Sequence, residues 1–427
     1  MLAVLGFVAT LTLVTSLIHF YLWRRLVRDT TRPGRWRRAG SLLALGLAIL
    51  VPTTMVSTRS AGMSWLAWPG YVWLAVMFYL LVVLVALEVP MLVVRLVGRA
   101  RSRQVGTSAP VPVTVPPPPA APPPPVAPPP PAELPGGRPV DDVVPDPSRR
   151  LLIARGVAIF AGLTAAGVTG YGVRTALGPP QLDRVRIPLA RLPRAMDGLR
   201  IATVSDIHIG PLTGPAHTAR IVELINSLDA DLVAVVGDLV DGTVTELGSS
   251  AAPLANLRSR YGSFFVTGNH EYYSGVEEWV AEVDRLGLQV LVNERRGIVT
   301  PGGVLDLAGV NDATGETAEV SGQLAGPDYE RALGDRDPDR PVVLLAHQPV
   351  QAQEAARFGV DLQLSGHTHG GQLVPFNLLV GLAQPVVSGL GSVDGTQVYV
   401  TNGAGFWGPP VRVGAPPQVS LVELRAG

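Results

Sequence analysis

Five short segments of the sequence carry the side chains best suited to catalysis. They are Asp206-Ile207-His208, Gly237-Asp238-Leu239-Val240-Asp241, Gly268-Asn269-His270-Glu271, Ala346-His347-Gln348 and Gly366-His367-Thr368-His369-Gly370-Gly371. They contain five of the seven histidines, and the chain has no cysteine. The available donors are therefore carboxylate, amide and imidazole groups without sulfur. This donor set favours Mn, Fe or Zn at a hydrolytic centre over a structural zinc site.

The spacing inside two of these segments predicts shared ligation. In a β-strand, residues i and i+2 point to the same side. Asp206 and His208 are therefore expected to converge on one ion, and the same holds for His367 and His369.

Each segment follows an apolar run typical of a strand. Such runs cover residues 199–204, 232–236, 264–266, 342–345, 362–364, 398–400 and 419–424, with helical patterns at 219–228 and 276–286. In α/β sheets, ligands collect at the carboxyl ends of strands. Glycines beside Asp238, Asn269 and His367 let the backbone turn sharply there. Residues 179–427 are therefore predicted to form a layered α/β domain.

The order of the five segments resembles the signature of the calcineurin-like metallophosphoesterase superfamily. The resemblance covers about residues 185–425 and implies a four-layer α-β-β-α sandwich. Residues 197–201 (Asp-Gly-Leu-Arg-Ile) and 403–408 (Gly-Ala-Gly-Phe-Trp-Gly) more narrowly resemble its membrane-associated, exported bacterial branch. Some members of that branch are UDP-2,3-diacylglucosamine pyrophosphatases.

The resemblance also implies a role for each polar residue. One divalent ion would be held by Asp206, His208 and His369, the other by Asn269, His347 and His367, with Asp238 bridging both. The implied nucleophile is a metal-bridging hydroxide whose pKa the two cations depress. His270 would be the catalytic residue that stabilises charge or protonates the leaving oxygen. Asp241 and Glu271 are expected to orient ligands from behind.

The N-terminal part of the chain is predicted to be a transmembrane region with three helices over residues 1–103. Apolar runs of spanning length cover residues 1–23, 39–56 and 65–87. The loop at 24–38 contains seven arginines, residues 95–103 contain four, and the loop between the second and third runs has only Arg59. By the positive-inside rule, the arginine-rich loops are cytoplasmic.

Two further segments separate this region from the α/β domain. Residues 104–147 form a proline-rich linker that favours extended polyproline II structure. Residues 148–178 begin with Ser-Arg-Arg-Leu-Leu and continue into an apolar run. This is either a fourth transmembrane helix or a twin-arginine-type signal anchor. Both interpretations place residues 179–427 on the extracytoplasmic side of a multi-pass membrane protein.

The sequence thus predicts a metal-dependent hydrolase that cleaves a phosphodiester or pyrophosphate bond at the outer face of the cytoplasmic membrane. A phosphomonoesterase or protein phosphatase, and a non-catalytic membrane sensor, stay open as alternatives. The expected partners are a phosphorylated small-molecule or lipid-linked substrate and the membrane. The net charge is zero, so no nucleic-acid partner is expected.

An apolar stretch follows the last metal-binding segment. Residues 373–382 read Leu-Val-Pro-Phe-Asn-Leu-Leu-Val-Gly-Leu. We expect them to form an exposed rim, extended by Phe406 and Trp407, because exposed apolar patches mark partners or membranes. The alternative is that they fill the core beneath a sheet.

Overall fold

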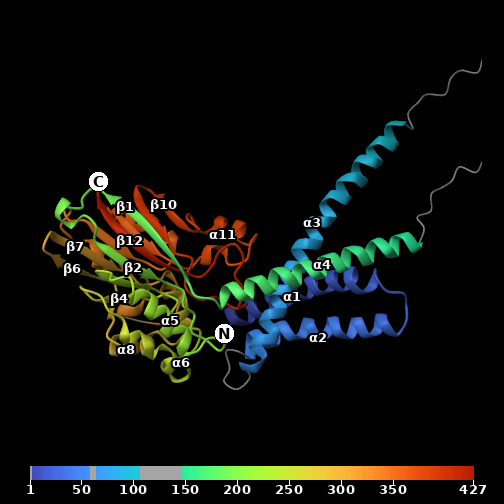
Figure 1. Ribbon diagram of the computed structural model, residues 1–427, viewed down its shortest axis with the longest axis horizontal. Helices are drawn as coiled ribbons and strands as arrows, with labels where there is room; N and C mark the ends of the chain where they lie inside the picture. The colour runs from blue at the N-terminus through green and yellow to red at the C-terminus, as the bar shows by residue number, and fades with distance from the viewer. Residues whose placement is uncertain (1, 58–63, 106–146, 321) are drawn as a thin grey trace, which may run out of the picture. The chain divides into compact units, whose positions relative to one another are not determined.

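The computed structural model describes residues 2–57, 64–105, 147–320 and 322–427. Four long helices precede the strands: α1 (Leu2–Trp23), α2 (Arg35–Ser57), α3 (Ala67–Val105) and α4 (Pro147–Ala176) (Figure 1). The predicted proline-rich linker lies outside the described residues except at its two ends. The boundaries predicted for the domains therefore stay predictions.

Three helices among the described residues are long and apolar enough to cross a membrane. They cover Arg35–Ser57, Ala67–Pro90 and Arg150–Ala176. Large apolar side chains on them are exposed, such as Leu42 and Leu163, which is the pattern of a helix that faces hydrocarbon. The third of these helices lies within residues 148–178, the segment predicted to be a fourth transmembrane helix or a signal anchor. It is an unbroken helix long enough to span a membrane, and both alternatives stay open.

The chain divides into two compact units. One contains Met1–Ser16, Leu45–Tyr79 and Ala165–Gly427, and the other contains Leu17–Ala44 and Leu80–Thr164. In the second unit, Glu88 accepts a hydrogen bond from Tyr21 Oη at 2.8 Å, and Arg25 Nε lies 2.6 Å from the same carboxylate oxygen. Pairing of this kind offsets the cost of holding a charge among apolar helices.

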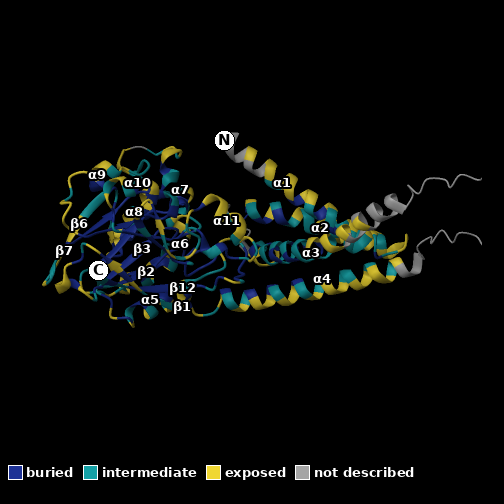
Figure 2. Ribbon diagram, turned by 90° about the horizontal axis from the view of Figure 1, so that it is seen from above, coloured by how far each residue is buried: buried dark blue, intermediate teal, exposed yellow. Residues whose placement is uncertain are grey.

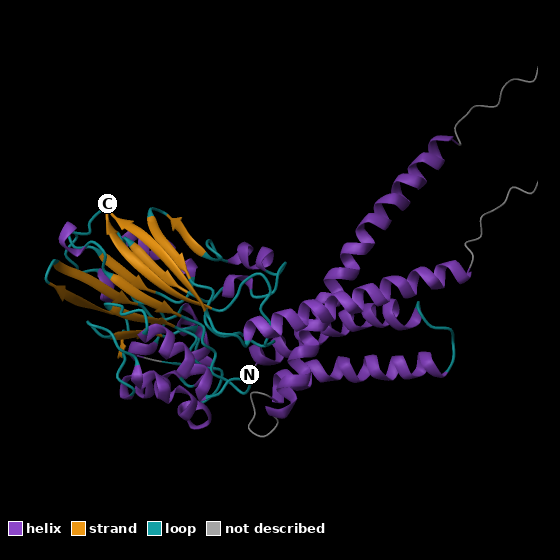
Figure 3. Ribbon diagram, in the orientation of Figure 1, coloured by secondary structure: helices purple, strands orange, loops and turns teal. Residues whose placement is uncertain are grey.

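The C-terminal part of the first unit contains two six-stranded sheets (Figure 3). The first has the order β1-β12-β2-β3-β4-β5 and the second β10-β11-β9-β8-β7-β6. The strands are β1 (Gln181–Leu189), β2 (Arg200–Val204), β3 (Leu232–Val236), β4 (Ser263–Val266), β5 (Gln289–Val290), β6 (Glu294–Thr300), β7 (Gly303–Gly309), β8 (Val342–Leu345), β9 (Leu362–Ser365), β10 (Gly389–Val393), β11 (Thr396–Val400) and β12 (Gln418–Ala426).

Helices cover the outer faces of both sheets. On the first sheet they are α5 (Pro215–Asn226), α6 (Val244–Ala251) and α8 (Val276–Arg285), and on the second they are α9 (Tyr329–Leu333) and α10 (Ala352–Ala355). Two further short helices are α7 (Asn269–Ser274), directly after β4, and α11 (Asn377–Ala383), which has no buried residue. In α8 the buried residues are Val276, Trp279 and Val283, at the i, i+3, i+7 spacing of an amphipathic helix. The two residues after the helix end, Leu286 and Gly287, turn the chain, with Gly287 at a φ of 92°.

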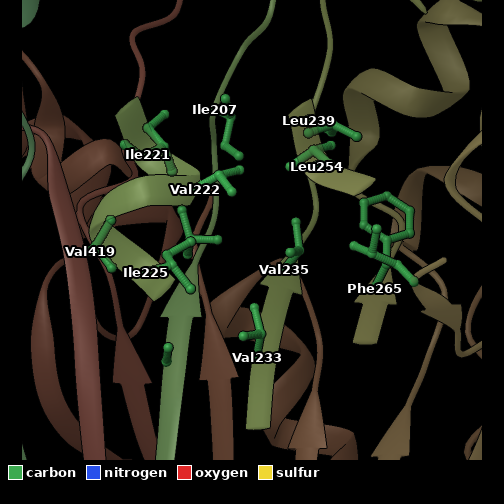
Figure 4. Packing of buried hydrophobic residues seen from close by; sticks show 14 of the residues in the cluster. Ile207, Ile221, Val222, Ile225, Val233, Val235, Leu239, Leu254, Phe265 and Val419 are labelled. Atoms are coloured by element: carbon green, nitrogen blue, oxygen red, sulfur yellow. The ribbon is translucent and has the colours of Figure 1, made fainter. Parts of the chain in front are cut away.

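Successive side chains of β3 point into two different hydrophobic cores, one on each face of the first sheet. Val233 and Val235 face α5, where they pack near Ile221 and Ile225 (Figure 4). Val236 and Ala234 belong instead to the core between the two sheets. A third core lies between the second sheet and α9 and α10. Burial is deepest along these strands (Figure 2). The predicted four-layer α-β-β-α sandwich is confirmed.

Strand direction brings the chemical segments together. Strands β2, β3 and β4 are mutually parallel, and so are β7, β8, β9 and β11. The five segments follow β2, β3, β4, β8 and β9 directly. The carboxyl ends of these strands therefore supply every predicted site residue.

Candidate metal centre

Left-handed backbone marks the predicted ligands. Nine described non-glycine residues have positive φ, and five of them are Asp206 (50°), His208 (46°), Asp238 (51°), His367 (69°) and His369 (52°). This conformation is unfavourable for residues with a Cβ and concentrates at functional sites. Asp206 and His208 lie just beyond their strand, so left-handed backbone and not strand alternation brings them into one donor group. His367 and His369 belong to two different donor groups, so the expectation that they converge on one ion is wrong.

The first predicted ligand set forms a compact group. Asp206, His208 and His369 each offer one donor atom, and these atoms lie within 4.8 Å of one another. The Nε2 atoms of the two histidines are 3.0 Å apart, and His369 Nε2 is 3.3 Å from Asp206 Oδ1. All three residues are buried.

The second predicted set is equally compact. Donor atoms of Asp238, His347 and His367 lie within 4.8 Å of one another, and Asn269 Oδ1 is 3.0 Å from His367 Nδ1. His347 Nδ1 donates to the Val236 carbonyl at 2.8 Å, which leaves the Nε2 lone pair directed at the site. That buried atom has no hydrogen-bond partner and lies 3.1 Å from Asp238 Oδ2.

Electrostatics also fit a bound cation. Asp206 and Asp238 are buried carboxylates, and a buried charge is costly unless it is paired. Burial and the neighbouring Arg412 guanidinium hold the pKa of His369 well below its usual value. The pKa of His367 is lowered by burial and by His347. Neutral imidazole is the form that binds metals. For His347, burial opposes protonation, but the charge of Asp238 outweighs it and raises the pKa well above its usual value, so a divalent ion would have to displace that proton.

Two glycines are needed for close approach. A Cβ at Gly268 would lie 2.3 Å from Asp238 Oδ1, and one at Gly366 would lie 2.2 Å from Asp206 Oδ2. Either side chain would force the neighbouring ligand out of position.

The Asp241 carboxylate contacts the imidazole rings of two histidines. Its Oδ1 accepts from His208 Nδ1 at 2.8 Å and lies 2.6 Å from His270 Nδ1. Burial opposes protonation of His270, but the charges of Asp238 and Asp241 outweigh it and raise the pKa of His270 to about 9. The imidazole is thus oriented by a carboxylate and holds its proton at neutral pH.

Glu271 stabilises the turns that carry the ligands. It accepts hydrogen bonds from the backbone N–H groups of Asp238 at 3.0 Å, Leu239 at 2.8 Å and Gly268 at 2.6 Å. The carboxylate thereby holds the segment after β3 against the segment after β4. Loss of partners that orient ligands in this way typically lowers metal affinity or activity by about 10- to 100-fold.

Arg412 is a site residue that the sequence interpretation missed. Its guanidinium is fully buried and donates to the carbonyls of His369 at 2.8 Å and Gly405 at 2.9 Å. Nη2 also lies 2.9 Å from His369 Nδ1. Because guanidinium only donates, Nδ1 accepts and Nε2 faces Asp206. The available signal was an arginine inside the apolar run 409–413.

Comparisons with known proteins agree with the metal-binding geometry, because the matches are metallophosphoesterases. A family model described as calcineurin-like phosphoesterase matches residues 199–371. The chain is 39% identical over 274 residues to a "Transmembrane protein with metallophosphoesterase domain" from Danio rerio, covering 62% of each. It is 39% identical over 280 residues to an uncharacterized metallophosphoesterase of Helicobacter pylori strain J99, covering 65% of this chain and 73% of the relative. A putative 5′-nucleotidase structure from Staphylococcus aureus matches with a TM-score of 0.35 and 13% identity, covering 53% of this chain and 54% of that one.

The chain belongs to the calcineurin-like metallophosphoesterase family, whose members are metal-dependent phosphoesterases. It spans less than two thirds of the length of the Danio rerio relative. The names of these relatives mention no UDP-2,3-diacylglucosamine pyrophosphatase, so the narrower resemblance to that branch stays a prediction.

Proposed function

We propose that this protein hydrolyses a phosphodiester or pyrophosphate bond at a two-metal centre on the outer face of the membrane. The observation that carries the proposal is the pair of buried donor groups at the ends of β2, β3, β4, β8 and β9, with Asp238 Oδ2 3.8 Å from His208 Nε2 and 3.1 Å from His347 Nε2. When bound, two divalent ions would supply charge neutralisation and an acidified water. The identity of the ions, Mn, Fe or Zn, is left to experiment.

The chain's own residues account for the remaining steps. Water adds to phosphorus, the bond to the leaving oxygen breaks, and that oxygen takes up a proton. His270 lines the cavity beside the first donor group, and its Nδ1 is held by Asp241. Nε2 is then the ring atom able to give the proton to the leaving oxygen.

The lining of the cavity favours a diester. Among the described residues that line it, none is arginine, and the charged side chains are the carboxylates of Asp241 and Glu246 and the protonated imidazole of His270, which already pairs with Asp241. A phosphomonoester dianion, or the second phosphoryl of a pyrophosphate, would bring an extra negative charge towards these carboxylates. A diester bears one charge and places an organic substituent there.

Substrate preference tests this function. With Mn, Fe(II) or Zn restored, the full-length protein is expected to hydrolyse bis(p-nitrophenyl) phosphate with a kcat/KM at least about tenfold above that for p-nitrophenyl phosphate, given the repulsion of one added charge. The measurement is p-nitrophenolate release in detergent. The reverse preference would establish the phosphomonoesterase alternative, and no hydrolysis of either ester with any metal would favour the sensor.

Topology tests the proposed location. The arginine distribution requires residues 24–38 and 95–155 inside and 179–427 outside. A phosphatase reporter that works only outside the cytoplasm is expected to be active when fused after Gly427 and inactive when fused at Gly136. Cleavage near Gly136 by external protease in intact cells would contradict this arrangement.

A further inference from the structure

One cavity is lined both by residues of the candidate metal centre and by the ends of two membrane-length helices. It has a volume of about 180 Å³, and its lining includes the predicted ligand His208 together with Asp241 and His270. The lining also includes Met55, near the end of α2, and Tyr71 and Leu74, near the start of α3. Both helical stretches belong to the same compact unit as residues 165–427.

The walls of this cavity are apolar beyond the catalytic end. Trp407 lines the cavity near His270: the two ring centroids are 6.5 Å apart, and Trp407 is 45% exposed. Gln372 fixes the Trp407 backbone, since its Oε1 accepts from Trp407 N at 3.0 Å. A polar substituent would find few partners on such walls, whereas a hydrocarbon chain would be favourably buried.

The loop that carries Trp407 is packed against the membrane-length helices. A Cβ placed on Gly408 would lie 3.8 Å from Tyr71 Cε1, so this part of the loop touches α3. Four residues later, Arg412 N donates to the Gly172 carbonyl of α4 at 3.0 Å. The catalytic end of the cavity is therefore anchored to two helices of spanning length.

The neighbouring surface is apolar and exposed. Helix α11 has no buried residue, and Leu378, Leu379 and Leu382 are 69%, 58% and 84% exposed (Figure 2). The segment before it is tied to the same loop, since Val374 N donates to the Val413 carbonyl at 3.1 Å. The exposed rim expected from the sequence is confirmed for these residues. The expectation is wrong for Phe406, which is 4% exposed and packs inside.

We propose that the substrate is a phosphodiester of a membrane lipid, with its phosphoryl group at the metal centre and its hydrocarbon chain along Met55, Tyr71, Leu74 and Trp407. This inference rests on the proposed function and names its substrate class. The α2 and α3 ends would then be part of the substrate site and would direct the chain towards the bilayer. The absence of arginine among the described lining residues agrees with a substrate that carries little charge beyond the reacting group.

A chain-length series tests the proposal with a constant leaving group. Full-length protein in nanodiscs would be given alkyl p-nitrophenyl phosphates with methyl, butyl, octyl and dodecyl chains. The kcat/KM is expected to rise by about tenfold for every two methylene groups that leave water, up to the length of the cavity. A kcat/KM that does not change with chain length, together with hydrolysis of the methyl ester, would overturn the lipid proposal and leave the proposed function standing.

Two variants of α3 test where the hydrocarbon chain of the substrate lies. Leu74→Ser is expected to reduce the ratio of dodecyl to methyl kcat/KM by about tenfold, since it removes apolar contact from the cavity wall. Val76→Ser, on the same helix and outside the cavity lining, is the matched control and should keep the ratio of the unaltered protein. An equal effect of both variants would contradict the proposed path.

A binding measurement covers the case in which no ester is hydrolysed. A dodecyl phosphonate with a diazirine near the chain end is expected to label the peptide containing Tyr71 and Leu74 on illumination, and excess dodecyl phosphonate should suppress the labelling. Labelling without hydrolysis would support the proposed binding site for the hydrocarbon chain and would contradict the proposed function. Labelling that is spread evenly over all membrane-length helices, and that excess dodecyl phosphonate does not suppress, would overturn the proposed binding site for the hydrocarbon chain.

Discussion

Replacing Asp238 by asparagine is expected to reduce phosphodiester hydrolysis to the background rate and to remove the bound metal at the same time. Asp238 Oδ2 lies near both donor groups, 3.8 Å from His208 Nε2 and 3.1 Å from His347 Nε2. A neutral amide at this position supplies no charge to offset two cations, so both ions should be lost. Metal content by mass spectrometry and p-nitrophenolate release are the two measurements.

The fold should survive this change. The Asp238 side chain accepts from His270 N at 2.8 Å through Oδ1, and an asparagine oxygen can accept the same bond. The backbone N–H of residue 238 keeps its bond to Glu271. The free energy of unfolding should therefore fall only by the amount due to metal loss, about 2.7 kcal/mol for each ion at a free metal concentration a hundredfold above its Kd.

An exposed aspartate on α8 offers a matched control. Asp284→Asn makes the same chemical change at an exposed position that belongs to none of the donor groups, and it should leave metal content and turnover unaltered. If Asp238→Asn retains hydrolysis within about tenfold of the unaltered protein, Asp238 is not the shared ligand.

The sequence predicts the strands well because apolar periodicity is a local signal. All seven predicted strands are present, from β2 (Arg200–Val204) to β12 (Gln418–Ala426), with small shifts at their ends. The patterns at 219–228 and 276–286 correspond to α5 and α8. The hairpin of β6 and β7 was not predicted. The β6 sequence, Glu-Arg-Arg-Gly-Ile-Val-Thr, mixes charged with apolar residues, and only its Ile298 is buried. Pairing with β8 through β7, a contact distant in sequence, stabilises it.

The site residues were found by type and spacing, but their geometry was not. Aspartate and histidine followed by a turn give no local indication of a φ near 50°, since that conformation is held by surrounding contacts. For Asp206 those contacts are the His367 N–H, which donates to its carboxylate at 3.0 Å, and Ser205 Oγ. Arg412 escaped notice for the same reason: its partners are carbonyls brought close only by the folded chain.

Replacing His270 by alanine is expected to lower turnover by about 10²- to 10⁴-fold, the usual contribution of a general acid. Metal content should stay close to that of the unaltered protein. The ring is held by Asp241 and lines the cavity at the edge of the first donor group. His208 would still be oriented through its own 2.8 Å contact with Asp241, so the ligand geometry does not depend on the lost imidazole.

The competing assignment makes His270 a ligand. One donor atom each of His208, Asp241 and His270 also lies within 4.8 Å of the others. In that arrangement His208 Nδ1 would have to leave Asp241 to bind an ion, and Asp241 would have to release both histidines. His270→Ala would then empty a metal position, and the metal-to-protein ratio would fall together with turnover. A leaving group of low pKa separates the two cases further, because it needs no proton: diesters of p-nitrophenol should lose less activity in His270→Ala than diesters of phenol. An equal loss for both esters, with reduced metal content, would assign His270 to metal binding and leave the proton donor elsewhere.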